Sequence, residues 1–150
     1  MRANHFEVFS TSIAQLIKAV QFLKSRKMAQ YGLKGTTALC LCQILDSEDG
    51  LTAGELAERG EIDKAQVSRC VAELTEKGFI LRGDEEGRRY KLKYQLTEKG
   101  RAAAEDIAAA ARRVQEAVSK NISDADLSVF YSTLYKLCEN FAALLEEEGE

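Results

Sequence analysis

Residues 51–101 read LTAGELAERGEIDKAQVSRCVAELTEKGFILRGDEEGRRYKLKYQLTEKGR, and the architecture of the chain follows from this stretch. Two segments with helical spacing of apolar residues come first. Two short strand-like runs follow, joined by a polar loop with a glycine at each side. The order helix, turn, helix, strand, loop, strand predicts a mainly α-helical domain that carries one small β-hairpin.

Capping signals predict where the first short helix begins and ends. Thr52 and Glu55 match a capping box, in which each side chain accepts a hydrogen bond from the backbone N–H of the other residue. The helix is predicted to run to about Arg59, and Gly60 is predicted to end it.

The second short helix is predicted to begin after Asp63, a strong N-cap residue, and to run to about Lys77 before Gly78. Its apolar residues recur at helical spacing and are expected to face the core: Val67, Cys70, Val71 and Leu74. Its polar residues are expected on the opposite face: Lys64, Gln66, Ser68, Arg69 and Glu73.

A hairpin follows the second helix. Phe79–Arg82 is predicted as a strand, residues 83–89 as a charged tip, and Tyr90–Leu96, which alternates apolar and polar side chains, as the returning strand. Together with the helices this is the outline of a winged helix-turn-helix, whose second helix enters the major groove of DNA. This DNA-binding lobe is expected to span residues 36–101.

Two helices are predicted before residue 51, and the second of them is the first helix of the lobe. Residues 5–28 carry apolar side chains alternately three and four positions apart, which predicts one long amphipathic helix. After a glycine-containing turn at residues 31–35, Thr36 or Thr37 is predicted to cap a second helix, largely buried, that runs to about Leu45.

Two further helices are predicted after the hairpin. Thr97 is predicted to cap a long alanine-rich helix, and Ser123 a last helix with another apolar stripe, followed by a solvated tail at Glu146–Glu148. The stripes of the first and last helices each need a partner, which is either another part of the chain or a second copy.

Composition indicates a soluble globular protein of 150 residues, 45% apolar and 30% charged, expected to form a single domain. Its apolar runs are far shorter than the ~20 residues of a membrane helix. Residues 1–5 lack the features of a signal peptide. We therefore expect a cytoplasmic protein with no membrane partner, whose four cysteines are free thiols.

The net charge of −3 is unevenly distributed along the chain. Residues 59–101 carry 11 basic and 8 acidic side chains, a net charge of +3, whereas residues 102–150 carry 4 basic and 10 acidic, a net charge of −6. Because binding to phosphate depends on local basic surface, the positive excess lies where a DNA reader needs it.

A helix that enters the major groove needs polar and basic side chains near its N-terminus. Gln66 can pair with adenine and Arg69 with guanine, while arginines at a wing tip are attracted to a narrow minor groove. The residues predicted to contact DNA are Thr52, Lys64, Ala65, Gln66, Ser68, Arg69, Arg88, Arg89 and Lys91.

These residues resemble the MarR-type winged-helix transcriptional regulators. The matching pieces are Leu51-Thr52 with Glu55-Leu56-Ala57, Val67-Ser68-Arg69 with Leu74 and Lys77-Gly78-Phe79-Ile80, and Leu96-Thr97-Glu98-Lys99-Gly100. The resemblance implies a homodimer, held by residues 1–30 and 102–150, that binds a palindromic operator in double-stranded DNA. The chain departs from the family at the wing, where Gly87-Arg88-Arg89-Tyr90 stands in place of the Asp-x-Arg of many members.

The resemblance further implies a repressor that a small effector, often an aromatic or phenolic molecule, releases from DNA. The implied pocket would be lined by Phe9, Ile13, Leu16, Leu39, Cys42 and Ile44. Release by an oxidant is a second option, with Cys40, Cys42, Cys70 or Cys138 as the sensing thiol, although buried inert thiols are the default.

Other classes of function have weaker support in the sequence. The single histidine, His5, has no nearby cysteine pair, so no metal-ligand set is expected. The chain shows no Ser-His-Asp or Cys-His set and no phosphate-binding glycine loop, so we expect neither an enzyme nor a cofactor. A winged-helix protein-interaction module that does not bind DNA is the alternative, supported by the acidic tail and the acidic wing tip.

Overall fold

The structure, a computed structural model, describes residues 4–83 and 92–149. Their elements are, in chain order, α1 (His5–Ala29), α2 (Gly35–Leu45), α3 (Ala53–Gly60), α4 (Lys64–Glu76), β1 (Ile80–Arg82), β2 (Tyr94–Leu96), α5 (Glu98–Val118) and α6 (Asp124–Glu148). The mainly α-helical fold with one small antiparallel hairpin is confirmed. The chain forms two compact units, Met1–Ala110 and Ala111–Glu150, and α5 contributes to both.

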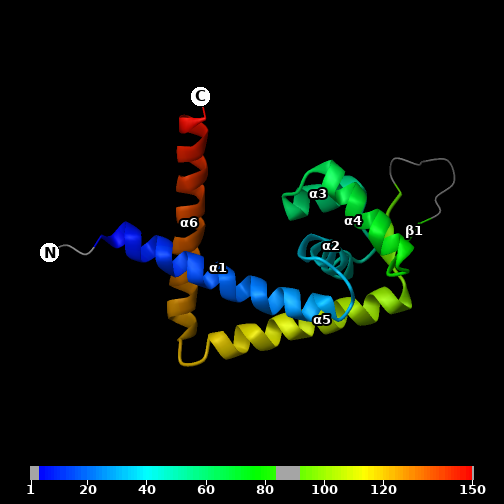
Figure 1. Cartoon of the computed structure of the whole chain (residues 1–150), viewed down its shortest axis with the longest axis horizontal. Coiled ribbons are helices and arrows are strands. Elements are labelled where there is room, and N and C mark those ends of the chain that lie inside the picture. Colours follow the sequence, from blue (N-terminus) through cyan, green and yellow to red (C-terminus); the bar gives the residue numbers. More distant parts are fainter. Residues whose placement is uncertain (1–3, 84–91, 150) are drawn as a thin grey trace. The chain divides into compact units, whose positions relative to one another are not determined.

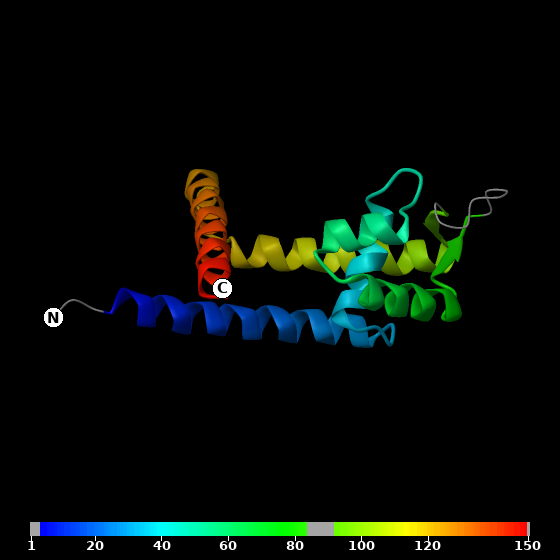
Figure 2. The same cartoon turned by 90° about the horizontal axis from the view of Figure 1, so that it is seen from above.

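The core of the first unit lies where α2, α3 and α4 pack together, with β1 at the edge of this group (Figure 1 and Figure 2). Leu41, Leu56, Val67 and Leu74 have no exposed surface. Each such aliphatic side chain stabilises the fold by roughly 1.5–3 kcal/mol through its removal from water. The predicted apolar face of α4 is therefore confirmed, because Cys70 and Val71 are buried with Val67 and Leu74.

Capping hydrogen bonds fix the N-termini of α3 and α4 at the positions that the sequence predicts. The backbone N–H of Glu55 donates to Thr52 Oγ1 at 3.2 Å, and the N–H of Thr52 donates to Glu55 Oε2 at 2.8 Å. The carboxylate of Asp63 accepts the N–H of Gln66 at 2.7 Å and so begins α4. These bonds satisfy N–H groups that a helix N-terminus leaves without partners.

Glu55 should make the stability of the first unit sensitive to acid. The N–H of Thr52 bonds to its carboxylate and holds the pKa of that carboxyl below its usual range. A lowered pKa in the folded state stabilises the fold above the unfolded-state pKa, and this contribution is lost as pH falls through the folded-state pKa. We expect Glu55→Ala to cost about 1 kcal/mol near neutral pH and much less at about pH 3. Urea unfolding at both pH values measures this, and an equal cost at both would contradict it.

The structure corrects the predicted start of α2. The helix begins at Gly35 with Lys34 as its N-cap residue, so neither Thr36 nor Thr37 caps it. Lys34 makes no side-chain capping bond, and its carbonyl accepts the N–H of Ala38 at 3.0 Å. Both threonines lie in the first turn, and their hydroxyls bond to α4 instead.

Two other predicted boundaries also differ. Gly60 is the last residue of α3, and it is Glu61 that adopts the left-handed conformation at φ 50° and ends the helix. The predicted tail at residues 146–148 is part of α6, and its glutamates are exposed on that helix.

The hairpin is shorter than predicted. β1 begins at Ile80 because the N–H of Phe79 bonds to Leu74 O at 2.9 Å and closes α4. β2 is Tyr94–Leu96, and residues 92–93 are not strand, while residues 90–91 lie outside the described part of the chain. The register pairs Ile80 with Leu96 and Arg82 with Tyr94.

A close backbone approach fixes the start of α5 against β1. Thr97 Oγ1 accepts the N–H of Gly100 at 3.0 Å, which confirms its predicted capping role, and donates to Gly78 O at 2.6 Å, while the backbone N–H of Thr97 donates to Phe79 O at 3.0 Å. A Cβ atom at Gly100 would lie 1.8 Å from Phe79 O. Only glycine fits at this contact.

The second unit consists of the last turns of α5 and α6. Asn121 adopts a left-handed conformation at φ 66° between the helices, and Ser123 caps α6 through the N–H of Asp126, as predicted. Gln115 Nε2 bonds to the hydroxyl of Tyr131 at 3.1 Å. Within residues 124–148, α6 has no buried residue: Phe130, Phe141 and Leu144 of its predicted apolar stripe are exposed, and Leu127, Leu134 and Leu137 are half-buried.

Candidate nucleic-acid interface

The exposed face of α4 carries most of the predicted major-groove residues. Lys64, Ala65, Ser68 and Arg69 are exposed and lie on the side opposite the buried Val67 and Leu74. The side chains of Lys64, Ser68 and Arg69 make no hydrogen bond or ion pair with the residues that the structure describes. Two cations and a hydroxyl are therefore available to a ligand of opposite charge.

The structure places Gln66 and Glu73 differently from the prediction. Both side chains are half-buried at the border between α4 and α2. Gln66 Nε2 donates to Thr36 Oγ1 at 3.2 Å, and Glu73 Oε2 accepts from Thr37 Oγ1 at 3.1 Å. For Gln66 to pair with a base edge, its bond to Thr36 would have to break.

The other predicted DNA contacts lie beside this face or outside the described residues. Thr52 is half-buried and its hydroxyl caps α3. Arg88, Arg89 and Lys91 fall in the segment 84–91, which lies outside the described residues. The base of the wing is described: Gly83 N–H donates to Lys93 O at 2.8 Å. The assignment of the charged wing tip to this interface therefore rests on the sequence alone.

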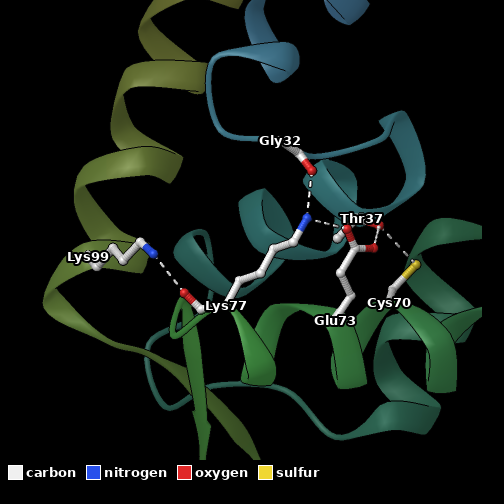
Figure 3. A network of polar contacts seen from close by, with 6 residues as sticks. All are labelled: Gly32, Thr37, Cys70, Glu73, Lys77 and Lys99. Atoms are coloured by element: carbon white, nitrogen blue, oxygen red, sulfur yellow. Dashed lines mark hydrogen bonds and ion pairs between the residues drawn. The ribbon is translucent and has the colours of Figure 1, made fainter.

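A network of polar contacts joins α4 to α2 and to the loop after α1, and sequence reasoning missed it (Figure 3). Lys77 Nζ donates to Glu73 Oε1 at 2.8 Å and to Gly32 O at 2.7 Å, while Thr37 bonds to the other oxygen of Glu73. The ammonium of Lys77 holds the pKa of the Glu73 carboxyl below its usual range. The only signal in the sequence was the pair Thr36-Thr37, which is also a capping signal.

A second cluster holds the end of α1 and the start of α5 around Phe79. Tyr31 packs edge-on against the Phe79 ring at a centroid distance of 6.4 Å, and Lys99 Nζ lies 4.5 Å from the ring centroid. The hydroxyl of Tyr31 donates to Asp106, which raises the pKa of Tyr31. Lys27 pairs with the same carboxylate at 2.6 Å. These contacts fix the loop after α1 beside α5.

The predicted effector-pocket residues differ widely in exposure. Ile44 belongs to the buried core at 3% exposure, whereas Leu16 and Leu39 are 54% and 42% exposed. Phe9, Ile13 and Cys42 are half-buried. A hollow of about 250 Å³ has a different lining, which shares only one residue with the prediction: Ile44, Ser47, Glu48, Gly50, Gln95, Leu96 and Arg101.

Burial makes two of the cysteines poor candidates for redox sensing. Burial raises the pKa of Cys40 to about 12, helped by the neighbouring thiol of Cys70, and it also raises the pKa of Cys42. A thiol reacts with oxidants mainly as its thiolate, so a raised pKa slows the reaction. Cys70 is buried as well, and Cys138 on α6 is exposed.

Within residues 4–83 and 92–149, no group of three or more histidine, cysteine, aspartate or glutamate side chains is arranged to hold a metal ion. No helix there is both long and apolar enough to span a bilayer.

Comparison with known proteins finds a matching protein family and a similar bacterial protein. Residues 31–89 match the sequence model of the MarR family. The chain is 26% identical over 141 residues to the HTH-type transcriptional repressor YetL of Bacillus subtilis (strain 168), covering 93% of this chain and 84% of the relative.

Solved structures share the fold over nearly the full length. A MarR family transcription regulator superposes with a TM-score of 0.81 at 20% identity, covering 96% of this chain and 95% of the other. Staphylococcus aureus MarR in complex with salicylate and kanamycin superposes with a TM-score of 0.76 at 19% identity, covering 91% of this chain and 92% of the other.

Proposed function

We propose that the chain is a cytoplasmic, homodimeric transcriptional repressor that binds a palindromic operator in double-stranded DNA, because residues 31–89 match the MarR family model and the fold superposes on that of a MarR family regulator. The observation that carries this proposal is the exposed face of α4, where Lys64, Ser68 and Arg69 lie without partners among the described residues. A helix with this face fits the major groove, where arginine pairs with guanine and lysine reaches phosphate.

The proposed interface combines α4 with its neighbours in sequence. Ala65 contacts the methyl group of a thymine or the groove wall, and Thr52 approaches the backbone from the start of α3. Gln66 contributes to recognition only after it leaves Thr36. We keep Arg88, Arg89 and Lys91 as proposed contacts of the wing with the minor groove and the adjacent phosphates.

A second copy of the chain would cover the apolar side chains that the single chain leaves exposed. In α1, Phe6 and Phe22 are 65% and 64% exposed, and in α6, Phe130 and Tyr135 are 50% and 69% exposed. Exposed apolar surface on this scale is typical of an interaction surface. A two-fold symmetric dimer through residues 1–30 and 102–150 also supplies the two reading helices that a palindrome requires.

The effector is proposed as a small aromatic or phenolic molecule. Support comes from the structural relative from Staphylococcus aureus, which is described in complex with salicylate. Release by an oxidant has less support at Cys40 and Cys42, whose raised pKa values disfavour the reactive thiolate. The name of the Bacillus subtilis relative supports repression.

Selection of bound duplexes from a random pool tests the proposed function. We expect one enriched palindrome, bound by two chains, with an affinity that falls steeply as salt concentration rises because counterions are released from phosphate. Light scattering of the complex measures the number of chains. If no duplex binds at low salt and a protein partner is recovered instead, the chain is the interaction module that the acidic tail favours.

A further inference from the structure

The side of α4 that faces α2 carries polar residues along its whole length. Gln66, Cys70, Glu73 and Lys77 are spaced four, three and four positions apart and so lie in one row, which we call the polar seam. Each member has a hydrogen-bonding partner outside α4: Thr36, Thr37 or the carbonyl of Gly32. The seam therefore connects the reading helix to α2 and to the loop after α1 from end to end.

Thr37, on α2, contacts the two central residues of the polar seam, Cys70 and Glu73, and is almost fully buried, at 3% exposure. Its hydroxyl donates to Glu73 Oε2 at 3.1 Å and lies 3.6 Å from Cys70 Sγ. An ionised carboxylate can only accept, and a hydroxyl has one proton. The proton of Thr37 therefore faces Glu73, and the hydroxyl oxygen is left to accept from the thiol of Cys70.

The negative charge of the Glu73 carboxylate also stabilises the N-terminus of α2. That helix has no acidic residue in its first turn, and its N-cap residue makes no side-chain hydrogen bond. A helix N-terminus is stabilised by negative charge. Glu73 supplies this charge from α4, through Thr37 in the first turn of α2.

Hydrogen bonds in the seam do what the apolar contacts of α4 cannot. The buried side chains of Val67, Val71 and Leu74 hold α4 against the core, but apolar contact is non-directional and tolerates small rotations and shifts along the helix axis. Hydrogen bonds weaken steeply when their angle or distance changes, so the seam fixes these two movements. The register of Ser68 and Arg69 against base edges depends on both.

We infer that Thr37 is a positioning residue for operator recognition, acting through Glu73 and Lys77 to fix the rotation and axial position of the reading helix. This inference rests on the proposed function, because it assigns a buried residue that does not contact DNA to the specificity of the same site. Base recognition requires the exact register of α4, whereas phosphate attraction does not. Disturbing the seam should therefore weaken specific binding and leave non-specific binding unchanged.

Thr37→Val and Thr37→Ser separate hydrogen bonding from packing. Valine keeps the volume and loses the hydroxyl, while serine keeps the hydroxyl and loses a methyl group. We expect Thr37→Val to lower affinity for the selected palindrome about tenfold, Thr37→Ser to stay within about twofold of the unchanged protein, and affinity for a mixed-sequence duplex to change in neither. A packing role predicts the opposite order, with serine the weaker binder, and would overturn the inference.

A second pair of variants tests the same point on the half-buried partner of Thr37. Glu73→Gln and Glu76→Gln each remove one negative charge from the same helix, but the side chain of Glu76 is exposed and makes no hydrogen bond or ion pair with the described residues. We expect Glu73→Gln to lower specific affinity relative to Glu76→Gln, and to speed hydrogen exchange of the backbone amides in residues 64–76. Equal binding by the two variants would overturn the inference.

The outcomes distinguish this inference from the proposed function. If the unchanged protein selects a palindrome and Thr37→Val binds it equally well, only the positioning role is wrong. If the unchanged protein binds no duplex, the proposed function fails and the positioning role fails with it. Affinities are compared at a temperature where circular dichroism shows every variant fully folded.

Discussion

Arg69→Ala is expected to lower affinity for the selected palindrome about 30-fold or more. A bidentate arginine–guanine contact discriminates by about 1–3 kcal/mol, and a symmetric dimer loses it in both half-sites. The side chain is exposed on α4 and makes no hydrogen bond or ion pair with the described residues, so its loss leaves no buried group without a partner. The unfolding midpoint should therefore stay the same, and a titration of labelled duplex measures the loss of affinity.

Arg101→Ala is the matched control for Arg69→Ala, because Arg101 lies outside the segments proposed for the dimer and is not a proposed DNA contact. It removes the same charge from an exposed position on α5 and leaves α4 unchanged. Its affinity should stay close to that of the unchanged protein. In a repeat of the random-pool selection, Arg69→Ala should also accept other base pairs at one position of each half-site. Similar losses in the two variants would mean that only net charge matters, and would remove Arg69 from the list of base contacts.

Gly100→Ala is expected to destabilise the first unit by about 3 kcal/mol or more. The added methyl carbon would lie 1.8 Å from Phe79 O and 2.7 Å from Phe79 C, and backbone atoms cannot move aside as a flexible side chain can. Overpacking typically costs ~1–3 kcal/mol, and this contact is at the severe end. Alanine gains at most about 1 kcal/mol over glycine in helix propensity, so the clash decides the sign.

Gly54→Ala provides the control for Gly100→Ala. Gly54 also lies within a helix, but a Cβ atom there would have Thr52 Oγ1 as its nearest neighbour, at 3.9 Å, an ordinary contact. This variant should be as stable as the unchanged protein or slightly more stable. Urea unfolding measures both, and equal midpoints for the two alanine variants would show that the backbone around Phe79 adapts to the methyl group.

The helices α3 and α4 could be predicted from the sequence because the signals that define them are local. The capping residues Thr52 and Asp63 act on N–H groups within three positions, and the apolar spacing of α4 depends on that helix alone. The predicted start of α2 was wrong because Thr36 and Thr37 act as a capping signal only when nothing else binds their hydroxyls. Here α4, about 30 residues further along the chain, binds them.

The same distinction explains what was missed in the site. The exposure of Arg69 follows from helical periodicity, but the half-burial of Gln66 and Glu73 depends on where α2 crosses α4. Those two residues lie at the edge of the buried stripe, where periodicity alone assigns neither face. The predicted pocket residues differ in exposure for a similar reason: which side chains of α1 and α2 are buried depends on tertiary packing.

Phe79 gives α4 and α5 a common pivot. Its N–H closes α4 at Leu74, its carbonyl accepts the N–H of Thr97 at 3.0 Å where α5 begins, and its ring lies between Tyr31 and Lys99. Because the end of α4 and the start of α5 are both hydrogen-bonded to Phe79, we expect a small tilt of α5 to displace the N-terminal end of α4. The displacement grows with distance from Phe79. The far end of α4 is the N-terminal turn that carries Lys64 and Ala65, the part of the helix that we propose enters the major groove.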